Sequence, residues 1–300
     1  MRQLPQVTLC CVDAKNHALA LRALARSRRE IRFARTLFLT DAIPPGVCLP
    51  EGIEVVPTGP IRSLEDYSRI VLKGLYPHVA TSHVLVVQWD GYVAHPELWM
   101  DEFLDWDYLG APWPDGKGGH YVGNGGFSLR SRKLLEALRD DRFPLLTNTE
   151  DVTICGHHRP RLESDFGIRF GPVDLAKWFS FEMDARDVVA GQKTFGFHGI
   201  FNLFAVESEE EIAAIALLLS DAMVVSEMAE LLLKNLVKFH QFGAACALGQ
   251  RMLEVRPENR VAADALALAG NALESRHATA PKENRIGLAS RILQKVRARH

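Results

Sequence analysis

The chain has 300 residues, of which 47% are hydrophobic and 24% charged, and its formal net charge at pH 7 is -2. This composition is typical of a globular protein, and the near-neutral charge argues against nucleic acid as the main partner. No apolar run approaches the roughly 20 residues of a membrane span, and the N-terminus lacks a signal-peptide core. The five cysteines show no Cys-x-x-Cys spacing, which favours free thiols in a reducing cytoplasm.

Strand and helix patterns alternate over the first hundred residues. Short apolar runs predict strands at residues 6–12, 36–39, 53–56 and 84–87. Helices are expected at residues 16–27, at residues 63–76, where Ser63 and Asp66 resemble a capping box, and at residues 96–106. This alternation predicts an α/β fold with a Rossmann-type mixed sheet flanked by helices.

The alternation becomes less regular after residue 106. Strands are expected at residues 108–111 and 168–170, and the proline- and glycine-rich residues 112–119 predict a mobile loop. One helix is expected to run through Leu138, and another to begin at Glu150 and Asp151, because acids favour a helix N-terminus.

From Ser208 onward the pattern is helical, so we expect a first domain at residues 1–205 and an all-α domain at residues 206–300. Spacings typical of a tetratricopeptide repeat occur at Leu232, Leu236, Ala245 and Pro257. Fewer than three repeats seldom stand alone, so this domain is expected to pack against the first domain or against a second copy of the chain as a homodimer.

The tail from Lys282 carries six Lys or Arg residues against one Glu. Two interpretations stay open for it. It suits a basic amphipathic helix in peripheral contact with the inner face of a membrane, and it also suits a solvated helix that covers the repeat.

The strand at residues 84–87 ends in a polar sequence formed by Gln88, Trp89, Asp90 and Gly91. In open α/β sheets a ligand sits beyond the carboxyl ends of the strands, so Asp90 is expected to face it. The alternative is an ordinary turn acid before a glycine.

Folds of this kind bind a nucleotide over their first βαβ half, which would place its base and ribose near Asp13 and Thr40, at the ends of the first two strands. We expect Tyr67 to stack on the base and Lys73 to approach the phosphates. Both also fit plain surface positions of a helix.

Three later stretches contain groups suited to sugar transfer from a nucleotide diphosphate. Gly123, Gly125 and Gly126 would leave open backbone for a substrate, and Asn124 offers both a donor and an acceptor. Asp151, beside Glu150, is the candidate base for the attacking hydroxyl, with Glu182 in reserve; a helix cap is the alternative role of these acids.

His198, between two glycines, is expected to join Asp90 in binding Mn²⁺ or Mg²⁺ against the leaving diphosphate; the alternative is a packing histidine.

The order of five motifs resembles the DUF5672 family, a glycosyltransferase-like domain that in turn resembles the GT-A glycosyltransferases. The resemblance covers about residues 5–204, through Gln-Trp-Asp-Gly, Gly-Ala-Pro-Trp, Gly-Asn-Gly-Gly-Phe-Ser-Leu-Arg, Glu-Asp and Gly-Phe-His-Gly. It implies that Asp90 takes the place of the last carboxylate of a metal-binding Asp-x-Asp motif, and that residues 123–126 line the donor and acceptor pocket. It further implies that Asp151 is the base of an inverting transfer and that His198 completes the metal site.

The motifs also place Gln88, Trp89 and Trp113 among the binding residues. Because Gln88 stands where the first carboxylate of Asp-x-Asp would be, the sequence predicts a weaker metal site, or a transfer assisted by Lys73 and Arg130 instead.

The leading hypothesis is a cytoplasmic glycosyltransferase that moves a sugar from a nucleotide-diphosphate donor to a glycan or surface-polysaccharide acceptor. One alternative is a nucleotidyltransferase, although the basic glycine-rich signature expected near its N-terminus is lacking. The other is a catalytically inactive nucleotide-sugar-binding scaffold, which Gln88 and the helical appendage would suit.

Overall fold

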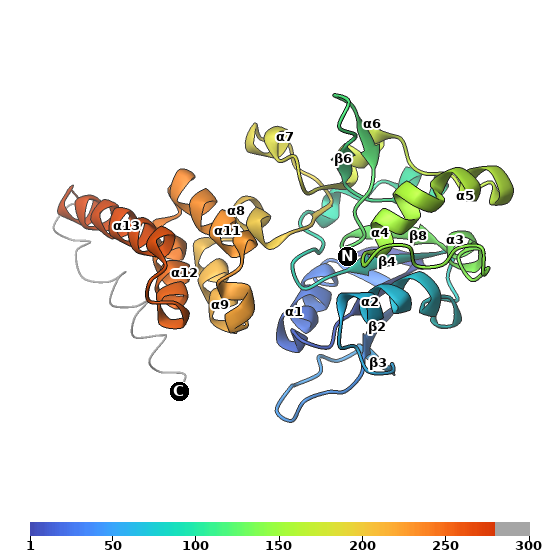
Figure 1. The fold of residues 1–300 in the computed structure, drawn as a ribbon, viewed down its shortest axis with the longest axis horizontal. Helices are drawn as coiled ribbons and strands as arrows, with labels where there is room; N and C mark the ends of the chain where they lie inside the picture. Colours follow the sequence, from blue (N-terminus) through green and yellow to red (C-terminus); the bar gives the residue numbers. More distant parts are fainter. Residues whose placement is uncertain (280–300) are drawn as a thin grey trace. The chain divides into compact units, whose positions relative to one another are not determined.

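The computed structural model describes residues 1–279 and divides the chain into two compact units, Met1–Val206 and the residues from Glu207 onward. The first unit contains a six-stranded mixed sheet in the order β3-β2-β1-β4-β8-β5 (Figure 1). The first four strands of this order, β3, β2, β1 and β4, run parallel, whereas β8 is antiparallel to both of its neighbours. The expected mixed α/β sheet is confirmed. Its strands are β1 (Arg2–Val12), β2 (Ile31–Thr40), β3 (Glu54–Pro57), β4 (His83–Val87), β5 (Tyr108–Leu109) and β8 (Ser128–Ser131).

Strand β4 is buried on both faces, as its uninterrupted apolar run predicts. Leu85 and Val87 pack into one apolar cluster, together with helix α1 (His17–Ser27). Val84 and Val86 pack into a second cluster on the opposite face of the sheet. The side chains that follow Val87 therefore emerge from the middle of the sheet at its carboxyl edge.

The predicted capping box opens helix α2 (Leu64–Arg69). Ser63 Oγ accepts a hydrogen bond from the Asp66 N–H at 3.1 Å, and the Asp66 carboxylate accepts one from the Ser63 N–H at 3.1 Å. The helix continues as a π-helical turn over Ile70–Gly74 and a 3₁₀ turn over Tyr76–His78.

The prediction of a helix at residues 96–106 is wrong. The segment forms two 3₁₀ turns, Pro96–Leu98 and Asp101–Asp105. Trp99 adopts a non-helical backbone between them, and its ring packs edge-on against Phe103 and Phe195. Contacts with an aromatic residue about a hundred positions away override the local helical pattern.

The loop expected at residues 112–119 is in part a hairpin of β6 (Pro112–Pro114) and β7 (His120–Val122). The two prolines flank Trp113, which faces Tyr121 in the ladder. Asp115 closes the turn, because its carboxylate accepts hydrogen bonds from the backbone of Lys117 and Gly119 at 2.8 Å each. Alternate prolines at an edge strand remove N–H groups that the ladder does not need.

The rest of the first unit consists of short elements. The strand expected at residues 168–170 is reduced to one isolated bridge between Tyr108 and Phe170. Strands β9 (Ser180–Phe181) and β10 (Gly196–Phe197) form a separate parallel pair. The helices are α3 (Arg132–Ala137), α4 (Glu150–Val152), α5 (Arg159–Phe166), α6 (Val173–Phe179), α7 (Arg186–Val189) and α8 (Leu203–Val206), with a π-helical turn at Thr153–His158 and a 3₁₀ turn at Ile200–Asn202.

The described part of the second unit is all α-helical, as expected. Ser208 caps its first helix by accepting a hydrogen bond from the Glu211 N–H at 3.3 Å. The Glu209 carboxylate reaches the start of another helix, where it accepts from the Gly243 and Ala244 N–H groups. The helices are α9 (Glu209–Leu218), α10 (Asp221–Val224), α11 (Glu227–Lys238), α12 (Phe242–Val255) and α13 (Arg260–Thr279).

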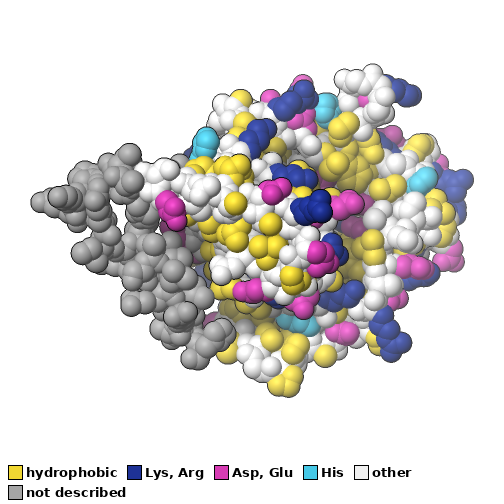
Figure 2. Space-filling model, turned by 60° about the vertical axis from the view of Figure 1, so that its left-hand side comes forward, with side chains coloured by type: hydrophobic (Ala, Val, Ile, Leu, Met, Phe, Trp, Pro, Cys, Tyr) yellow, Lys and Arg dark blue, Asp and Glu magenta, His cyan; other side chains and the backbone are white. Residues whose placement is uncertain are grey.

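The tetratricopeptide character and the contact with a second copy stay predictions. The second unit exposes several large apolar side chains, namely Leu217, Leu218, Met228, Leu231 and Leu268. On the face drawn in Figure 2, hydrophobic side chains are interspersed with acidic and basic ones. The basic tail from Lys282 lies outside the described residues. Within residues 1–279, no helix has both the length and the apolar character needed to cross a membrane.

Candidate functional site

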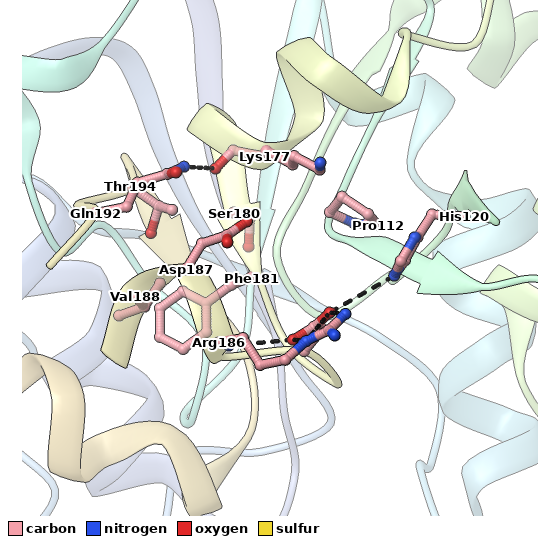
Figure 3. Close-up of a pocket in the computed structure, with 11 residues that line it drawn as sticks. Pro112, His120, Lys177, Ser180, Phe181, Arg186, Asp187, Val188, Gln192 and Thr194 are labelled. Atoms are coloured by element: carbon pink, nitrogen blue, oxygen red, sulfur yellow. Dashed lines mark hydrogen bonds and ion pairs between the residues drawn. The ribbon is translucent and has the colours of Figure 1, made fainter. Parts of the chain in front are cut away.

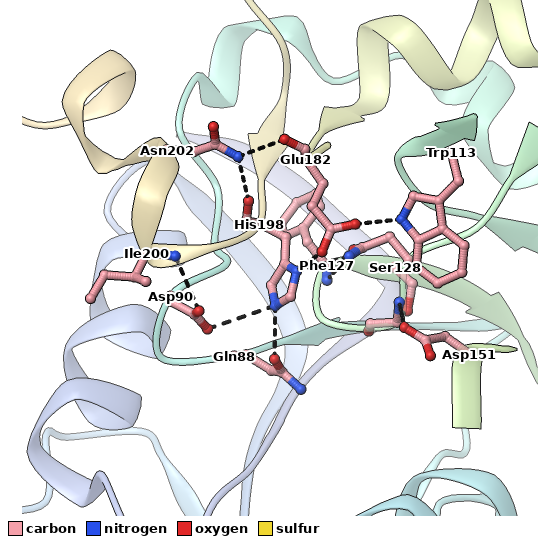
Figure 4. A network of polar contacts seen from close by, with 12 residues as sticks. Gln88, Asp90, Trp113, Phe127, Ser128, Asp151, Glu182, His198, Ile200 and Asn202 are labelled. Carbon is pink, nitrogen blue, oxygen red and sulfur yellow. Dashed lines mark hydrogen bonds and ion pairs between the residues drawn. The ribbon is translucent and has the colours of Figure 1, made fainter. Parts of the chain in front are cut away.

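Side chains from three separate segments meet beyond the carboxyl end of β4 (Figure 4). His198 lies at the centre. Its Nε2 atom is 2.9 Å from Gln88 Oε1 and 3.7 Å from Asp90 Oδ1. Its Nδ1 atom is 2.7 Å from Glu182 Oε1. The four residues, here called the His198 cluster, are Gln88, Asp90, Glu182 and His198. The carboxylate after the central strand and the late histidine are therefore close enough to share a ligand.

A tight turn after β4 positions Asp90. The backbones of Gln88 and Gly91 pair with each other through N···O distances of 2.9 and 3.1 Å. The Asp90 carbonyl accepts from the Gly199 N–H at 2.9 Å, and its carboxylate accepts from the Ile200 N–H at 3.2 Å. The turn at Asp90 and the segment at residues 198–200 are thus joined through backbone groups as well as through side chains.

The glycine-rich loop after β7 approaches the cluster closely. A Cβ atom on Gly126 would overlap the imidazole of His198, and one on Gly125 would overlap the Glu150 carboxylate. A Cβ atom on Gly123 would overlap the indole of Trp113. These glycines make room for side chains of the site itself. That they also leave open backbone for a substrate stays a prediction.

Asn124 adopts a left-handed backbone conformation, with φ of 59°, which asparagine tolerates better than most residues. Its Oδ1 atom accepts a hydrogen bond from the Phe127 N–H at 3.0 Å, and this fixes the orientation of the amide. The Nδ2 atom then lies 2.8 Å from His198 Nδ1, and the amide also contributes a hydrogen bond to Glu182. Asn124 is fully buried, so its role is to support the cluster.

Opposing electrostatic effects act on the cluster. Burial alone would lower the pKa of His198, but Asp90 and Glu182 outweigh it and raise that pKa to about 9. Burial raises the pKa of Asp90, with partial compensation by His198. Burial would also raise the pKa of Glu182, yet hydrogen bonds from His198 and Trp113 hold it below its usual range. Without a bound cation, the imidazolium is the positive charge that balances two half-buried carboxylates.

The cluster fits a hard divalent cation in its donor chemistry. Asp90 and Gln88 present oxygens, and Mg²⁺ or Mn²⁺ takes oxygen ligands but few of them from protein. The Nδ1–H of His198 points to a carboxylate, an arrangement common for histidines that bind a metal through Nε2. Among residues 1–279, no group of three or more His, Cys, Asp or Glu side chains is arranged to hold a metal ion.

The paired acids play two different structural roles. Asp151 is half-buried, and its carboxylate accepts a hydrogen bond from the Gly125 N–H at 2.9 Å. Glu150 is buried and ion-paired with Arg130 at 2.9 Å. The Glu150 carboxylate is therefore engaged inside the protein, and Arg130 is fully buried. Arg130 was expected to assist the transfer, but its burial gives it a structural role inside the core.

The two residues expected near the nucleotide base lie at the same edge of the sheet. Asp13 follows β1, and its carboxylate accepts hydrogen bonds from the Lys15 and Asn16 backbone at the start of α1. Thr40 ends β2 and is buried, with its hydroxyl 3.1 Å from His17 Nε2. Their polar groups already have protein partners.

Of the other expected donor residues, Tyr67 lies at the cluster. Its hydroxyl accepts a hydrogen bond from Gln88 Nε2 at 2.5 Å, a contact that the expected stacking role did not include. Trp89 is half-buried and packs on the main apolar core. Lys73 lies apart, because its ammonium group donates to the carbonyls of Leu138 and Asp140. The expectation that Lys73 approaches the phosphates is therefore not met, because its ammonium group is engaged by protein carbonyls.

The contact between Trp113 and Glu182 was missed by sequence reasoning. The indole N–H of Trp113 donates to Glu182 Oε2, across 69 positions of the chain. Both residues were candidates, but no local pattern relates them. The one sequence signal that could have pointed to this contact is that each residue belongs to a short motif rich in aromatic residues.

Comparisons with known proteins give one family and several similar structures. Residues 52–198 match the family model described as "Protein of unknown function (DUF5672)", which confirms the family expected from the motifs. A glycosyltransferase involved in the glycosylation of the major capsid of PBCV-1 is similar in structure, with 13% identity and a TM-score of 0.40, over 64% of this chain and 91% of that chain.

An active-site mutant of LgtC is similar in structure with 13% identity and a TM-score of 0.39, over 64% of this chain and 86% of that chain. No curated protein sequence matches the chain.

Proposed function

We propose that this chain, whose middle part carries a DUF5672 domain, is a glycosyltransferase that moves a sugar from a nucleotide-diphosphate donor to a glycan acceptor with inversion. The observation that supports it is the convergence of Asp90, Glu182 and His198 beyond the carboxyl end of β4. That edge is where open α/β sheets bind their ligands. Asp90 and His198, with Glu182 orienting the imidazole, are suited to hold a cation that takes its other ligands from a diphosphate and water.

The donor side of the reaction depends on the His198 cluster. A divalent cation held by Gln88, Asp90 and His198 would stabilise the negative charge that develops on the leaving diphosphate. Glu182 keeps the imidazole oriented through Nδ1, so that Nε2 faces Gln88 and Asp90. Trp113 and Asn124 in turn fix Glu182.

The acceptor side depends on Asp151. Its carboxylate takes the proton of the attacking hydroxyl, whose oxygen forms a bond to the anomeric carbon of the sugar. The bond from that carbon to the diphosphate oxygen breaks, and its electron pair leaves with the nucleoside diphosphate. The Gly125 N–H fixes this carboxylate beside the glycine-rich loop. Asp151 suits the role better than Glu150, whose carboxylate is engaged by Arg130.

A second candidate function is nucleotide-sugar binding without turnover. It is favoured by Gln88, whose amide is tied to both Tyr67 and His198 and adds no charge to the cluster.

The experiment that tests the proposal incubates the full-length protein with a panel of UDP-, GDP-, dTDP- and ADP-sugars and Mn²⁺. Asp151→Asn should lower donor turnover by about 100-fold or more, because a positioned base contributes at least that factor. The matched control is Asp174→Asn, which changes an acid in the first turn of another short helix. That variant should react like the wild type.

Two results would contradict the proposal. Binding of a nucleotide sugar without any turnover by the wild type would favour the inactive scaffold. Equal turnover by wild type and Asp151→Asn would remove Asp151 as the base.

A further inference from the structure

A pocket of about 300 Å³ opens beside the His198 cluster. Its walls come from the β6–β7 hairpin, from α6 and β9, and from α7 with the segment that leads to β10. Figure 3 shows its lining side chains on all sides of this space. All of these elements belong to the first unit, and no residue of the pocket had been singled out from the sequence as part of a site.

Ser180 supplies the clearest sign that the pocket is built for a polar ligand. The residue is fully buried in β9, lines the pocket, and its hydroxyl has no hydrogen-bond partner among the described residues. Buried hydroxyl groups in native proteins nearly always have a partner. A ligand hydroxyl in the pocket would supply one.

The charges of the pocket balance. Lys177 and Arg186 are cationic, and Asp184 and Asp187 are anionic. Arg186 donates to the Asp184 carboxylate at 2.5–3.1 Å, and His120 lies 3.7 Å from the same group. A pocket with paired charges offers both donors and acceptors but has no net attraction for an anion. This chemistry suits the hydroxyl groups of an uncharged sugar, and Phe181 adds an apolar surface.

Two residues that line the pocket are direct chain neighbours of residues at the proposed reaction site. Phe181 lines it and directly precedes Glu182, and Pro112 lines it and directly precedes Trp113. The hydrogen bond between Trp113 and Glu182 thus links the two chain segments that contribute Pro112 and Phe181 to the pocket. On the other side of Trp113, its indole packs against Gly123, two residues before the loop glycine that holds Asp151.

We propose that this pocket binds the acceptor, and that the acceptor presents an uncharged, polyhydroxylated sugar to it. The inference rests on the proposed function, because the word acceptor has meaning only if the chain transfers a sugar. Ser180, Arg186 and Asp184 supply hydrogen bonds to the sugar hydroxyls, and the bound saccharide reaches Asp151 past Trp113.

The test measures saccharide binding directly, by ligand-observed NMR titration of the full-length protein. The probes are the methyl glycosides of glucose, galactose, mannose and rhamnose, with glucuronate as the anionic comparison. Wild type should bind at least one neutral glycoside more tightly than glucuronate. Val188→Trp, which fills part of the pocket, should weaken that binding by about tenfold or more. Val189→Trp, at the exposed neighbouring position outside the lining, should bind within about twofold of wild type.

Two further variants test the polar contacts. Ser180→Ala should weaken glycoside binding by about fivefold, the value of one hydrogen bond, without lowering the melting temperature, since no protein partner is lost. Arg186→Ala should weaken it by about tenfold. Arg142→Ala is the matched control, because Arg142 is also exposed and paired with an aspartate two residues earlier, and it should bind like wild type.

The outcomes separate this inference from the proposed function. Donor hydrolysis by the wild type, measured without saccharide, tests the function alone. If the donor is hydrolysed but no glycoside binds, or if Val188→Trp binds as well as Val189→Trp, the acceptor pocket is overturned while the function stands. If glycosides bind in the pocket but no donor is hydrolysed, the acceptor role is overturned together with the function.

Discussion

The Nδ1 atom of His198 lies 2.7 Å from Oε1 of Glu182, so one carboxylate determines which imidazole nitrogen faces the other carboxylate, that of Asp90. The two acids come from segments more than 90 positions apart in the sequence. Their shared histidine is therefore both a structural link and the group whose charge decides what else can occupy the cluster.

The first prediction concerns pH and the stability of the cation-free protein. The folded-state pKa of His198 is raised to about 9, above the unfolded value near 6.5. The stability that this group contributes is thus fully present below about pH 6.5 and is lost as the pH rises through 9. Its upper size is on the order of 3 kcal/mol. Urea unfolding between pH 6 and 9.5 should show this loss in wild type but not in His198→Gln.

His95→Gln is the control for this prediction. Burial lowers the pKa of His95, so removing it should leave the loss between pH 6.5 and 9 in place. A wild-type stability curve parallel to that of His198→Gln over this range would contradict the assigned charge state.

The second prediction concerns cation binding. A divalent ion at Nε2 must displace the proton of His198, so its apparent affinity should rise about tenfold per pH unit below pH 9. Calorimetric titration with Mn²⁺ and a nucleoside diphosphate at pH 6.5 and 8.5 measures this rise. Asp90→Asn should weaken binding at both values, whereas Asp101→Asn, at an exposed position, should not. Equal affinities for wild type and Asp90→Asn would remove the cation from this cluster.

The third prediction tests how closely the glycine-rich loop approaches the histidine. A methyl group on Gly126 would occupy the space of the imidazole, so Gly126→Ala should destabilise the protein by about 1–3 kcal/mol and weaken nucleotide binding. Gly156→Ala is the control, because a Cβ atom there meets nothing within 4 Å in a helical turn. It should be neutral or stabilising by up to about 1 kcal/mol. Equal unfolding midpoints for both variants would mean that the loop can move away from His198.

Local patterns were sufficient to predict five of the six strands of the main sheet, but not β8. The apolar run of β4, the capping box at Ser63 and the change to helix at Ser208 each depend on neighbouring residues, and each occurs where it was expected. The segment around Trp99 was mispredicted because its conformation depends on Phe195, which no local pattern can reveal. The same reason explains the missed contact of Trp113 with Glu182.

The sequence shows the chemical type of each candidate residue. It does not show whether the side chain is free to meet a ligand or is engaged by another protein group. Glu150 and Asp151 are adjacent acids, yet one faces the buried Arg130 and the other the Gly125 N–H. Which of two neighbours turns inward depends on a cation 20 positions away. Lys73 was misplaced in the same way, because its carbonyl partners lie in a later loop.

The last prediction concerns the ion pair between Arg130 and Glu150. Removing the guanidinium in Arg130→Met would leave a buried carboxylate without a counter-charge, at a cost of about 3–5 kcal/mol. Burial already raises the pKa of Glu150, and loss of Arg130 would raise it further. A group whose folded pKa is raised contributes stability that is lost as the pH rises through that pKa, so the variant should be less destabilised at pH 5 than at pH 8.

A double-mutant cycle in urea measures the coupling, because Arg130→Met with Glu150→Gln removes both charges and should cost less than the sum of the single changes. Additive free energies of unfolding at both pH values would contradict a direct interaction between the two groups.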